Sequence, residues 1–226
     1  MTKDGDAVFL FDCDNTLLDN DRVHDDIDAQ LRGTFGADGL KRFWQIYEEL
    51  RVERGYADYL GAVQRFYLEL AHDPRVLKLS GFLLDYPFGS RLYPAALDAV
   101  RHCRKWGLTV ILSDGDAVYQ PRKLERSGIS DAVEGRVLIY VHKEHRLDQV
   151  QARYPARRYV MVDDKLRILA AMKSVWGDRL FSVFPRQGHY ALDTAALVAL
   201  PPADLTIDHI GALATYDFSF LNGARA

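Results

Sequence analysis

The hydrophobic pattern of the chain opens with a short apolar run and then changes to a helical rhythm. Residues 7–11 are all apolar, which favours a strand buried on both faces of a parallel sheet. Between residues 17 and 86 apolar positions recur at spacings of three and four, which predicts several consecutive helices without a strand. The positions that carry this rhythm are Ile27, Leu31, Phe35, Phe43, Trp44, Tyr47, Leu50, Leu60, Val63, Phe66, Tyr67 and Leu70.

After residue 93 the pattern alternates between strand and helix. We predict strands at residues 108–112, 137–141, 159–162, 180–184 and 205–207, and helices at 95–106, 120–127, 146–154 and 166–176. Glycines follow three of these helices, as is common at helix ends. Such alternation indicates parallel strands joined by right-handed helical crossovers. The predicted fold class is therefore α/β, with a doubly wound, mainly parallel sheet.

The helical block interrupts this alternation, so we interpret it as an insertion after the first strand. The predicted α/β core comprises residues 1–16 and 91–226, and the inserted all-helical domain comprises residues 17–90. Hinges between the two are expected near residues 17–21 and 87–90.

Composition narrows the class of protein. The 226 residues are 48% hydrophobic and carry a net charge of −3, with no broad basic field for a nucleic-acid backbone. Cys13 and Cys103 are too few for a disulfide framework or a zinc site. The first six residues are polar, and no apolar run approaches the roughly 18 residues of a membrane span. We therefore expect a cytoplasmic protein that binds neither nucleic acid nor membrane; its oligomeric state stays open.

Polar side chains follow four of the predicted strands. An Asp or Ser at such a place is by itself most often a turn former or a helix cap. Parallel strands, however, bring their carboxyl ends to one edge of the sheet, where ligands of open α/β folds bind. The residues at this edge are Asp12, Asp14, Ser113, Asp114, His142, Lys143, Asp163 and Asp164.

Together these side chains can form one coherent site. Acids from the first and fourth strand ends can hold Mg²⁺, which prefers carboxylate and water oxygens. Ser113 and amides at the helix start, at Asp114 and Gly115, can bind phosphoryl oxygens. Lys143 can offset the remaining negative charge.

Three segments resemble motifs of the haloacid dehalogenase-like superfamily. FLFDCDNTL at residues 9–17 resembles the first motif, VILSDG at 110–115 the second, and VMVDD at 160–164 the acidic fourth. Lys143 matches the third motif in order, although the Lys-Pro dipeptide common in relatives is missing. Asp114 stands where relatives often have Asn. The helical insertion is similar to the family's cap between motifs one and two.

The resemblance implies Mg²⁺-dependent hydrolysis of small phosphate monoesters. Asp12 would attack phosphorus to give an aspartyl-phosphate, and Asp14 would protonate the leaving oxygen and then activate water. The metal would join Asp12, the carbonyl of Asp14 and Asp164, while Asp163 would bind through water or orient Lys143.

Three other functions remain as alternatives. Haloacid dehalogenation displaces halide from carbon and needs no acid two residues after the nucleophile, so Asp14 argues against it. A phosphomutase would keep the same residues and differ in how its cap excludes water. A non-catalytic binding protein on the same fold would be free to lose motif residues, and none is lost here.

Further lysines and the cap supply weaker candidates. We expect Lys123 to point to solvent and Lys165 to face away from the metal, so alanine at either position should leave turnover within a few-fold. In the cap, Arg51, Arg54 and Tyr56 are candidates for substrate selection, with a solvated or core face as the simpler interpretation. The loop at residues 184–190 lies near the predicted site and is assigned no role.

Overall fold

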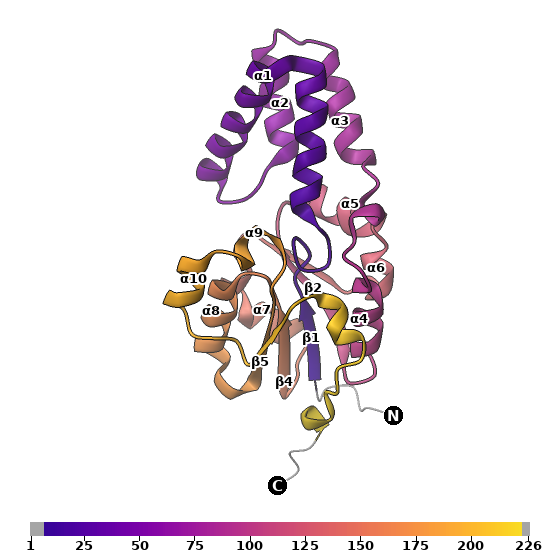
Figure 1. Ribbon diagram of the computed structural model, residues 1–226, viewed down its shortest axis with the longest axis vertical. Coiled ribbons are helices and arrows are strands. Elements are labelled where there is room, and N and C mark those ends of the chain that lie inside the picture. Colours follow the sequence, from indigo (N-terminus) through magenta and orange to yellow (C-terminus); the bar gives the residue numbers. More distant parts are fainter. Residues whose placement is uncertain (1–6, 223–226) are drawn as a thin grey trace.

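The computed structural model describes residues 7–222, and for residues 194–196 and 222 the backbone alone. Its centre is one six-stranded parallel sheet in the order β3-β2-β1-β4-β5-β6, flanked by helices on both faces (Figure 1). The predicted α/β class is confirmed. The strands are β1 (Ala7–Phe11), β2 (Leu108–Asp114), β3 (Val137–Tyr140), β4 (Arg158–Val162), β5 (Leu180–Pro185) and β6 (Leu205–Ile207).

Strand β1 lies in the middle of the sheet, which explains its uninterrupted apolar run. Phe9 and Phe11 belong to the hydrophobic cluster on one face, and Val8 and Leu10 to that on the other. The first face is covered by α4 (Ala96–Cys103), α5 (Tyr119–Arg126) and α6 (Ile129–Ala132), and the second by α7 (Leu147–Arg153) and α8 (Leu166–Trp176). Burial on both faces leaves the carboxyl ends of the strands as the place for polar chemistry.

The inserted helices stand beyond that end of the sheet (Figure 1). They are α1 (Asn20–Arg54), α2 (Tyr59–Glu69) and α3 (Arg75–Asp85). Gly36 breaks α1 into two segments, because its φ of 71° and ψ of −171° are not helical. Phe43 and Phe66 pack edge to face between α1 and α2. We call these three helices the cap.

Two chain segments connect the cap to the core, and they pair with each other. Leu18 bridges Leu92 in antiparallel fashion, the amide of Asp19 donates to the carbonyl of Arg91 at 2.8 Å, and that of Tyr93 to Leu17 at 3.0 Å. The pairing lies beside the hinges predicted at residues 17–21 and 87–90. The exact domain division stays a proposal, and the outermost core residues, 1–6 and 223–226, lie outside the described part of the chain.

Several short elements escape sequence analysis because a single turn has too few residues for a periodic pattern. Besides α6, these are α9 (Gly188–Ala191), α10 (Thr194–Ala199) and the 3₁₀ helices η1 (Phe88–Arg91), η2 (Lys143–His145), η3 (Gly177–Arg179), η4 (Ile210–Ala214) and η5 (Ser219–Asn222). Within residues 7–222 no helix combines the length and the apolar character needed to cross a membrane.

Candidate active site

The sheet brings the predicted catalytic residues together at its carboxyl edge. Asp12 directly follows β1, and its amide continues the ladder by donating to the carbonyl of Val162 at 2.9 Å. Ser113 lies at the end of β2, and Asp163 and Asp164 follow β4. Asp12, Asp163 and Asp164 are buried and each offers a carboxylate oxygen, all within 4.8 Å of one another.

Lys143 is fully buried among these acids. Its Nζ lies 2.5 Å from Oδ1 of Asp12 and 2.7 Å from Oδ2 of Asp163, and it donates to the carbonyl of Leu112 at 3.3 Å. Its backbone amide donates to Asp114 at 2.8 Å, which fixes the start of η2. Burial alone would lower the pKa of Lys143, but the charges of Asp12, Asp163 and Asp114, in that order, outweigh burial and raise that pKa. The lysine therefore stays charged.

Asp164 is a buried carboxylate. Among the described residues neither of its side-chain oxygens has a hydrogen-bond partner, and Oδ2 of Asp12 has none either. Burial, then the charges of Asp163 and Asp12, raise the pKa of Asp164 well above its usual range. Unpaired buried carboxylates are costly unless a cation or proton compensates them. The oxygen-only donor set, with free oxygens on two acids, fits Mg²⁺.

Asp14 turns its carboxylate away from this acidic cluster. Its Oδ1 accepts a hydrogen bond from Nζ of Lys123 at 2.7 Å, on the side that faces the cap. Burial raises the pKa of Asp14, but Lys123 outweighs this and the net pKa is lowered. Only the main-chain carbonyl of Asp14 is thus left for the predicted role beside a metal, and that role stays a proposal.

The expectation that Lys123 points to solvent is wrong. Its side chain is 2% exposed and also donates to Oδ1 of Asn20 at 3.1 Å. The ring of Tyr119, one turn earlier on α5, lies 5.6 Å from Nζ. The cap covers this face of α5. The helix face that we expect from sequence to be solvated is therefore buried.

The expectation that Lys165 faces away is also wrong. Its Nζ lies 4.9 Å from the centre of the Tyr190 ring, and the residue lines the cavity described below. Burial lowers the pKa of Lys165, yet Asp12, Asp164 and Asp163, in that order, outweigh it and raise the pKa. Lys165 therefore adds a second cation beside the acidic cluster.

The turn after β2 is held by internal hydrogen bonds. Ser113 Oγ accepts from the side-chain amide of Gln120 at 2.9 Å and donates to the carbonyl of Asp114 at 3.3 Å. The amide of Gly115 donates to the carbonyl of Tyr140 at 2.9 Å. The phosphate-binding amides expected here therefore do not include Gly115, because its hydrogen is already used.

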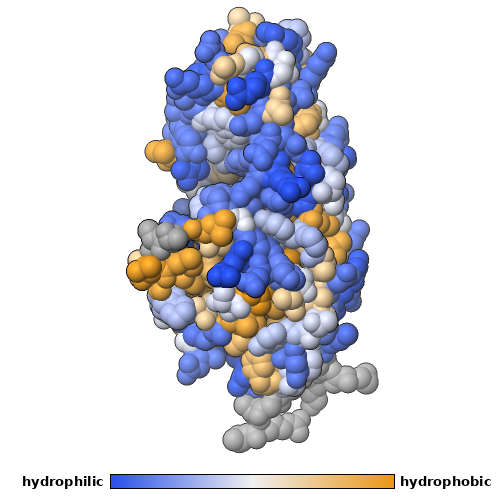
Figure 2. All heavy atoms as spheres, in the orientation of Figure 1, coloured by the Kyte–Doolittle hydropathy of each residue, from blue (hydrophilic) through white to orange (hydrophobic). Residues whose placement is uncertain are grey.

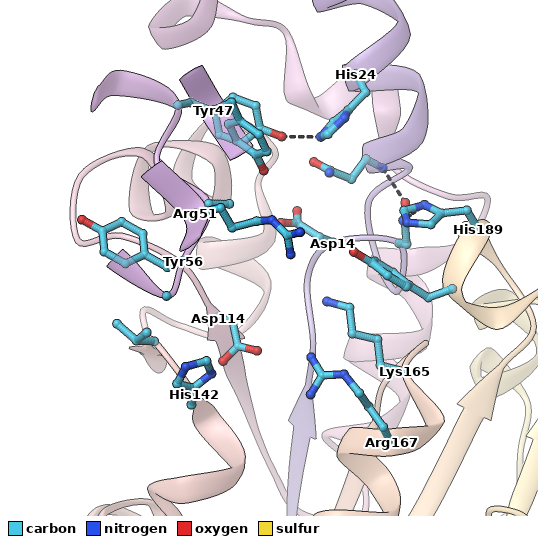
Figure 3. A pocket seen from close by; sticks show the side chains of 18 residues that line it. Asp14, His24, Tyr47, Arg51, Tyr56, Asp114, His142, Lys165, Arg167 and His189 are labelled. Atoms are coloured by element: carbon cyan, nitrogen blue, oxygen red, sulfur yellow. Dashed lines mark hydrogen bonds between the residues drawn. The ribbon is translucent and has the colours of Figure 1, made fainter. Parts of the chain in front are cut away.

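A cavity of about 260 Å³ separates the cap from the core (Figure 3). Arg51 and Tyr56 line it, as the specificity role requires, whereas Arg54 is outside the lining and pairs with Asp58. The lining residues are Asp14, Asn15, Asn20, His24, Tyr47, Arg51, Gly55, Tyr56, Ala57, Tyr59, Asp114, Gly115, Val141, His142, Lys165, Arg167, His189 and Tyr190.

The loop after β5 closes one side of this cavity. Gln187 donates to the carbonyl of Thr16 at 3.0 Å, which ties the loop to the first motif. The backbone amide of His189 donates to Asp21 of α1 at 2.9 Å, and its ring lies 2.6 Å from the same carboxylate. The segment at residues 184–190, which had no assigned role, thus joins the core to the cap.

Comparison with known proteins identifies the family. Residues 7–175 match the sequence profile of the haloacid dehalogenase-like hydrolases. The chain belongs to this family. No curated protein matches this haloacid dehalogenase-like hydrolase.

Solved structures agree with that assignment. A protein from Burkholderia xenovorans LB400 assigned to the haloacid dehalogenase-like hydrolases is 63% identical, with a TM-score of 0.88 over 94% of this chain and 99% of its own. An L-2-haloacid dehalogenase from Xanthobacter autotrophicus is 14% identical (TM-score 0.61), and a magnesium-bound HAD-hydrolase from Bacillus subtilis is 15% identical (TM-score 0.61); each comparison covers 96% of this chain and 98% of the other. These two distant likenesses show the fold alone.

Sequence reasoning on this haloacid dehalogenase-like hydrolase missed several cavity residues. Lys165 and Arg167 lie at the start of α8, directly after the fourth motif, and this closeness to a motif was the available signal. Tyr47 belongs to the helical rhythm of the cap, which makes it look like a core position, and His24 lies one turn before that rhythm begins at Ile27. Their role depends on which helix face meets the core, and periodicity alone does not specify this.

Proposed function

We propose that this hydrolase removes the phosphoryl group from small phosphate monoesters in a Mg²⁺-dependent reaction. The observation that supports this best is the arrangement at the carboxyl edge of the sheet. Asp12 has one oxygen paired with Lys143 and one free, Asp164 has two free oxygens, and Asp14 lies two residues beyond Asp12 on the cavity side. Asp14 lines the cavity, and the buried Asp12 and Asp164 each lie within two residues of a lining residue, Asp14 and Lys165 respectively.

The metal would be held by Asp12, Asp164 and the carbonyl of Asp14. Asp163 is committed to Lys143, which favours its orienting role over direct binding. When bound, Mg²⁺ would offset the negative charge of the carboxylates and of the phosphoryl oxygens.

Asp12, Asp14 and Lys143 would each have a separate role in the reaction. Asp12 attacks phosphorus, and the leaving oxygen takes a proton from Asp14 as the aspartyl-phosphate forms. Asp14 next removes a proton from the water that releases phosphate and regenerates Asp12. A bound phosphoryl group is negatively charged, as is the Asp14 carboxylate, so it would raise the pKa of Asp14. This opposes Lys123, which lowers that pKa. Lys143 holds Asp12 in place and neutralises charge on the transferred group.

This arrangement favours phosphoryl transfer over dehalogenation. Displacement of halide from carbon requires no proton for the leaving group, so it gives no reason for Asp14 on the cavity side. It also gives none for the free oxygens of buried Asp164. Phosphomutase action would use the same residues, and the cavity offers no observation that favours it over hydrolysis.

A substrate panel tests the proposal directly. Phosphorylated metabolites and 2-haloacids should be incubated with the protein in Mg²⁺ and in excess chelator. We expect phosphate release from some monoesters in Mg²⁺, its loss with chelator, and no halide release. Phosphate release that persisted in chelator, or halide release alone, would contradict the proposal.

Mg²⁺ binding should depend on Asp164 more than on Asp163. Asp164 has both oxygens free, whereas Asp163 is paired with Lys143, so Asp164→Asn should weaken Mg²⁺ binding on the order of 10-fold or more and Asp163→Asn less. Calorimetric titration measures both affinities, and the rise in Tm on adding Mg²⁺ gives a second readout. Equal, negligible losses would refute the assignment.

A further inference from the structure

The cavity wall holds more positive charge than one phosphoryl group requires. Figure 3 shows Arg51, Lys165 and Arg167 extending into the same space, Arg51 from the cap and the other two from the start of α8. The two carboxylates of the wall are already engaged, since Asp14 accepts from Lys123 and Asp114 from the backbone amide of Lys143. Three side-chain cations therefore line the cavity, and neither carboxylate of the wall pairs with them.

Lys165 differs from Arg51 and Arg167 in its position and in its acidic neighbours. Lys165 directly follows Asp164 in the chain and lines the cavity, on the side where the phosphoryl group would bind. Among the described residues no carboxylate lies within ion-pair distance of Lys165, whereas each arginine has one acidic neighbour. Lys143 and Lys165 would bind the phosphoryl group of the substrate. Arg51 and Arg167 could then bind another group of the same substrate.

The acidic neighbours of the arginines hold them weakly. Arg51 pairs with Glu48 at 2.8 Å, and both side chains are about half exposed (53% and 54%), a setting in which ion pairs contribute little. Arg167 is 60% exposed and meets the largely buried Glu144 through Nη1 alone, at 3.3 Å, so its other guanidinium nitrogens form no ion pair within the described residues. Guanidinium groups bind carboxylate or phosphate in bidentate fashion, so a ligand anion between them would compete well with these contacts.

We infer that Arg51 and Arg167 form a subsite for a second anionic group, so that the substrate is a small phosphate monoester that also carries a carboxylate or a second phosphate. This inference rests on the proposed phosphatase function and deepens it. One guanidinium comes from the cap and one from the core, so the second anion bridges the two. The cavity of about 260 Å³ limits the substrate to a small metabolite.

Matched substrates that differ by one anion test the inference. 3-Phosphoglycerate and glycerol 3-phosphate form a carboxylate pair, and fructose 1,6-bisphosphate and fructose 6-phosphate form a phosphate pair. In at least one pair the doubly anionic member should have a kcat/KM about tenfold higher or more, the range of a charge-assisted contact. The pair that shows it identifies the second group.

Variants then assign the preference to residues. Arg51→Gln and Arg167→Gln should each reduce the preferred pair's kcat/KM ratio about tenfold, mainly through KM, because the contact exists before chemistry. Arg32→Gln removes the same charge from an exposed position of α1 and should keep the parent ratio. Circular dichroism checks that all three variants fold.

The possible failures are distinguishable. Turnover of the monoesters without preference in either pair, or a ratio unchanged in both Arg51→Gln and Arg167→Gln, would overturn the second-anion subsite alone. Absence of turnover of all four compounds and of p-nitrophenyl phosphate would overturn the phosphatase proposal together with the inference.

Discussion

Asp12→Asn should reduce phosphate release by roughly 10⁴-fold or more, the scale seen when a nucleophile that acts as part of a unit is removed. The amide cannot attack phosphorus, and the neighbouring Asp164 would be occupied by Mg²⁺ in the proposed reaction. Asp163 is paired with Lys143, and Asp14 turns toward Lys123. Single-turnover and steady-state phosphate release with saturating Mg²⁺ measure the effect.

The substitution is nearly isosteric, so the fold should persist, as thermal unfolding can verify. Asp98→Asn makes the same change at an exposed position of α4 and serves as the matched control. A folded Asp12→Asn protein that kept more than about one percent of parent turnover would exclude the aspartyl-phosphate mechanism, because removal of the nucleophile should cost far more than about 100-fold.

Lys143→Ala should lower turnover by at least on the order of 10²-fold, as expected for one preorganised electrostatic group. Its ammonium contacts both Asp12 and Asp163, and alanine would leave two buried carboxylates facing each other without a cation. Steady-state kinetics in saturating Mg²⁺ provides the measurement, with far-UV circular dichroism to establish that the variant is folded.

Lys105→Ala is a suitable control for this variant. Lys105 is exposed and precedes β2, so it lies at the opposite end of the strand from the site. Lys123 and Lys165 are unsuitable as controls. Lys123 donates a hydrogen bond to Asp14, and Lys165 lines the cavity. Near-parent turnover in folded Lys143→Ala, together with a large loss in Lys123→Ala or Lys165→Ala, would transfer the role to that lysine.

Much of the fold was predictable because buried parallel strands leave a plain signature. The apolar run at residues 7–11 coincides with β1, and the predicted helix at 166–176 coincides with α8. The acidic cluster was predictable for the same reason: strand direction alone brings Asp12 and Asp164 to one edge. These inferences need only the connectivity of the sheet.

The orientation of long side chains was not predictable in this way. Lys123 lies on an α5 face that would be solvated in the core alone and is buried by the cap. Lys165 was assigned by assuming that neighbours on the chain point to opposite sides, but the start of α8 turns it into the cavity. Both errors concern the contact between two bodies, which local periodicity does not encode.

The paired connection between cap and core restricts how the cap can move. Single unpaired linkers would allow it to swivel, but the bonds joining Asp19 to Arg91 and Tyr93 to Leu17 make the two linkers one narrow ribbon. A ribbon bends across its flat side more easily than it shears in its plane. We therefore expect one soft direction of bending for the cap, which would keep Arg51 on the side of the cavity that faces Arg167.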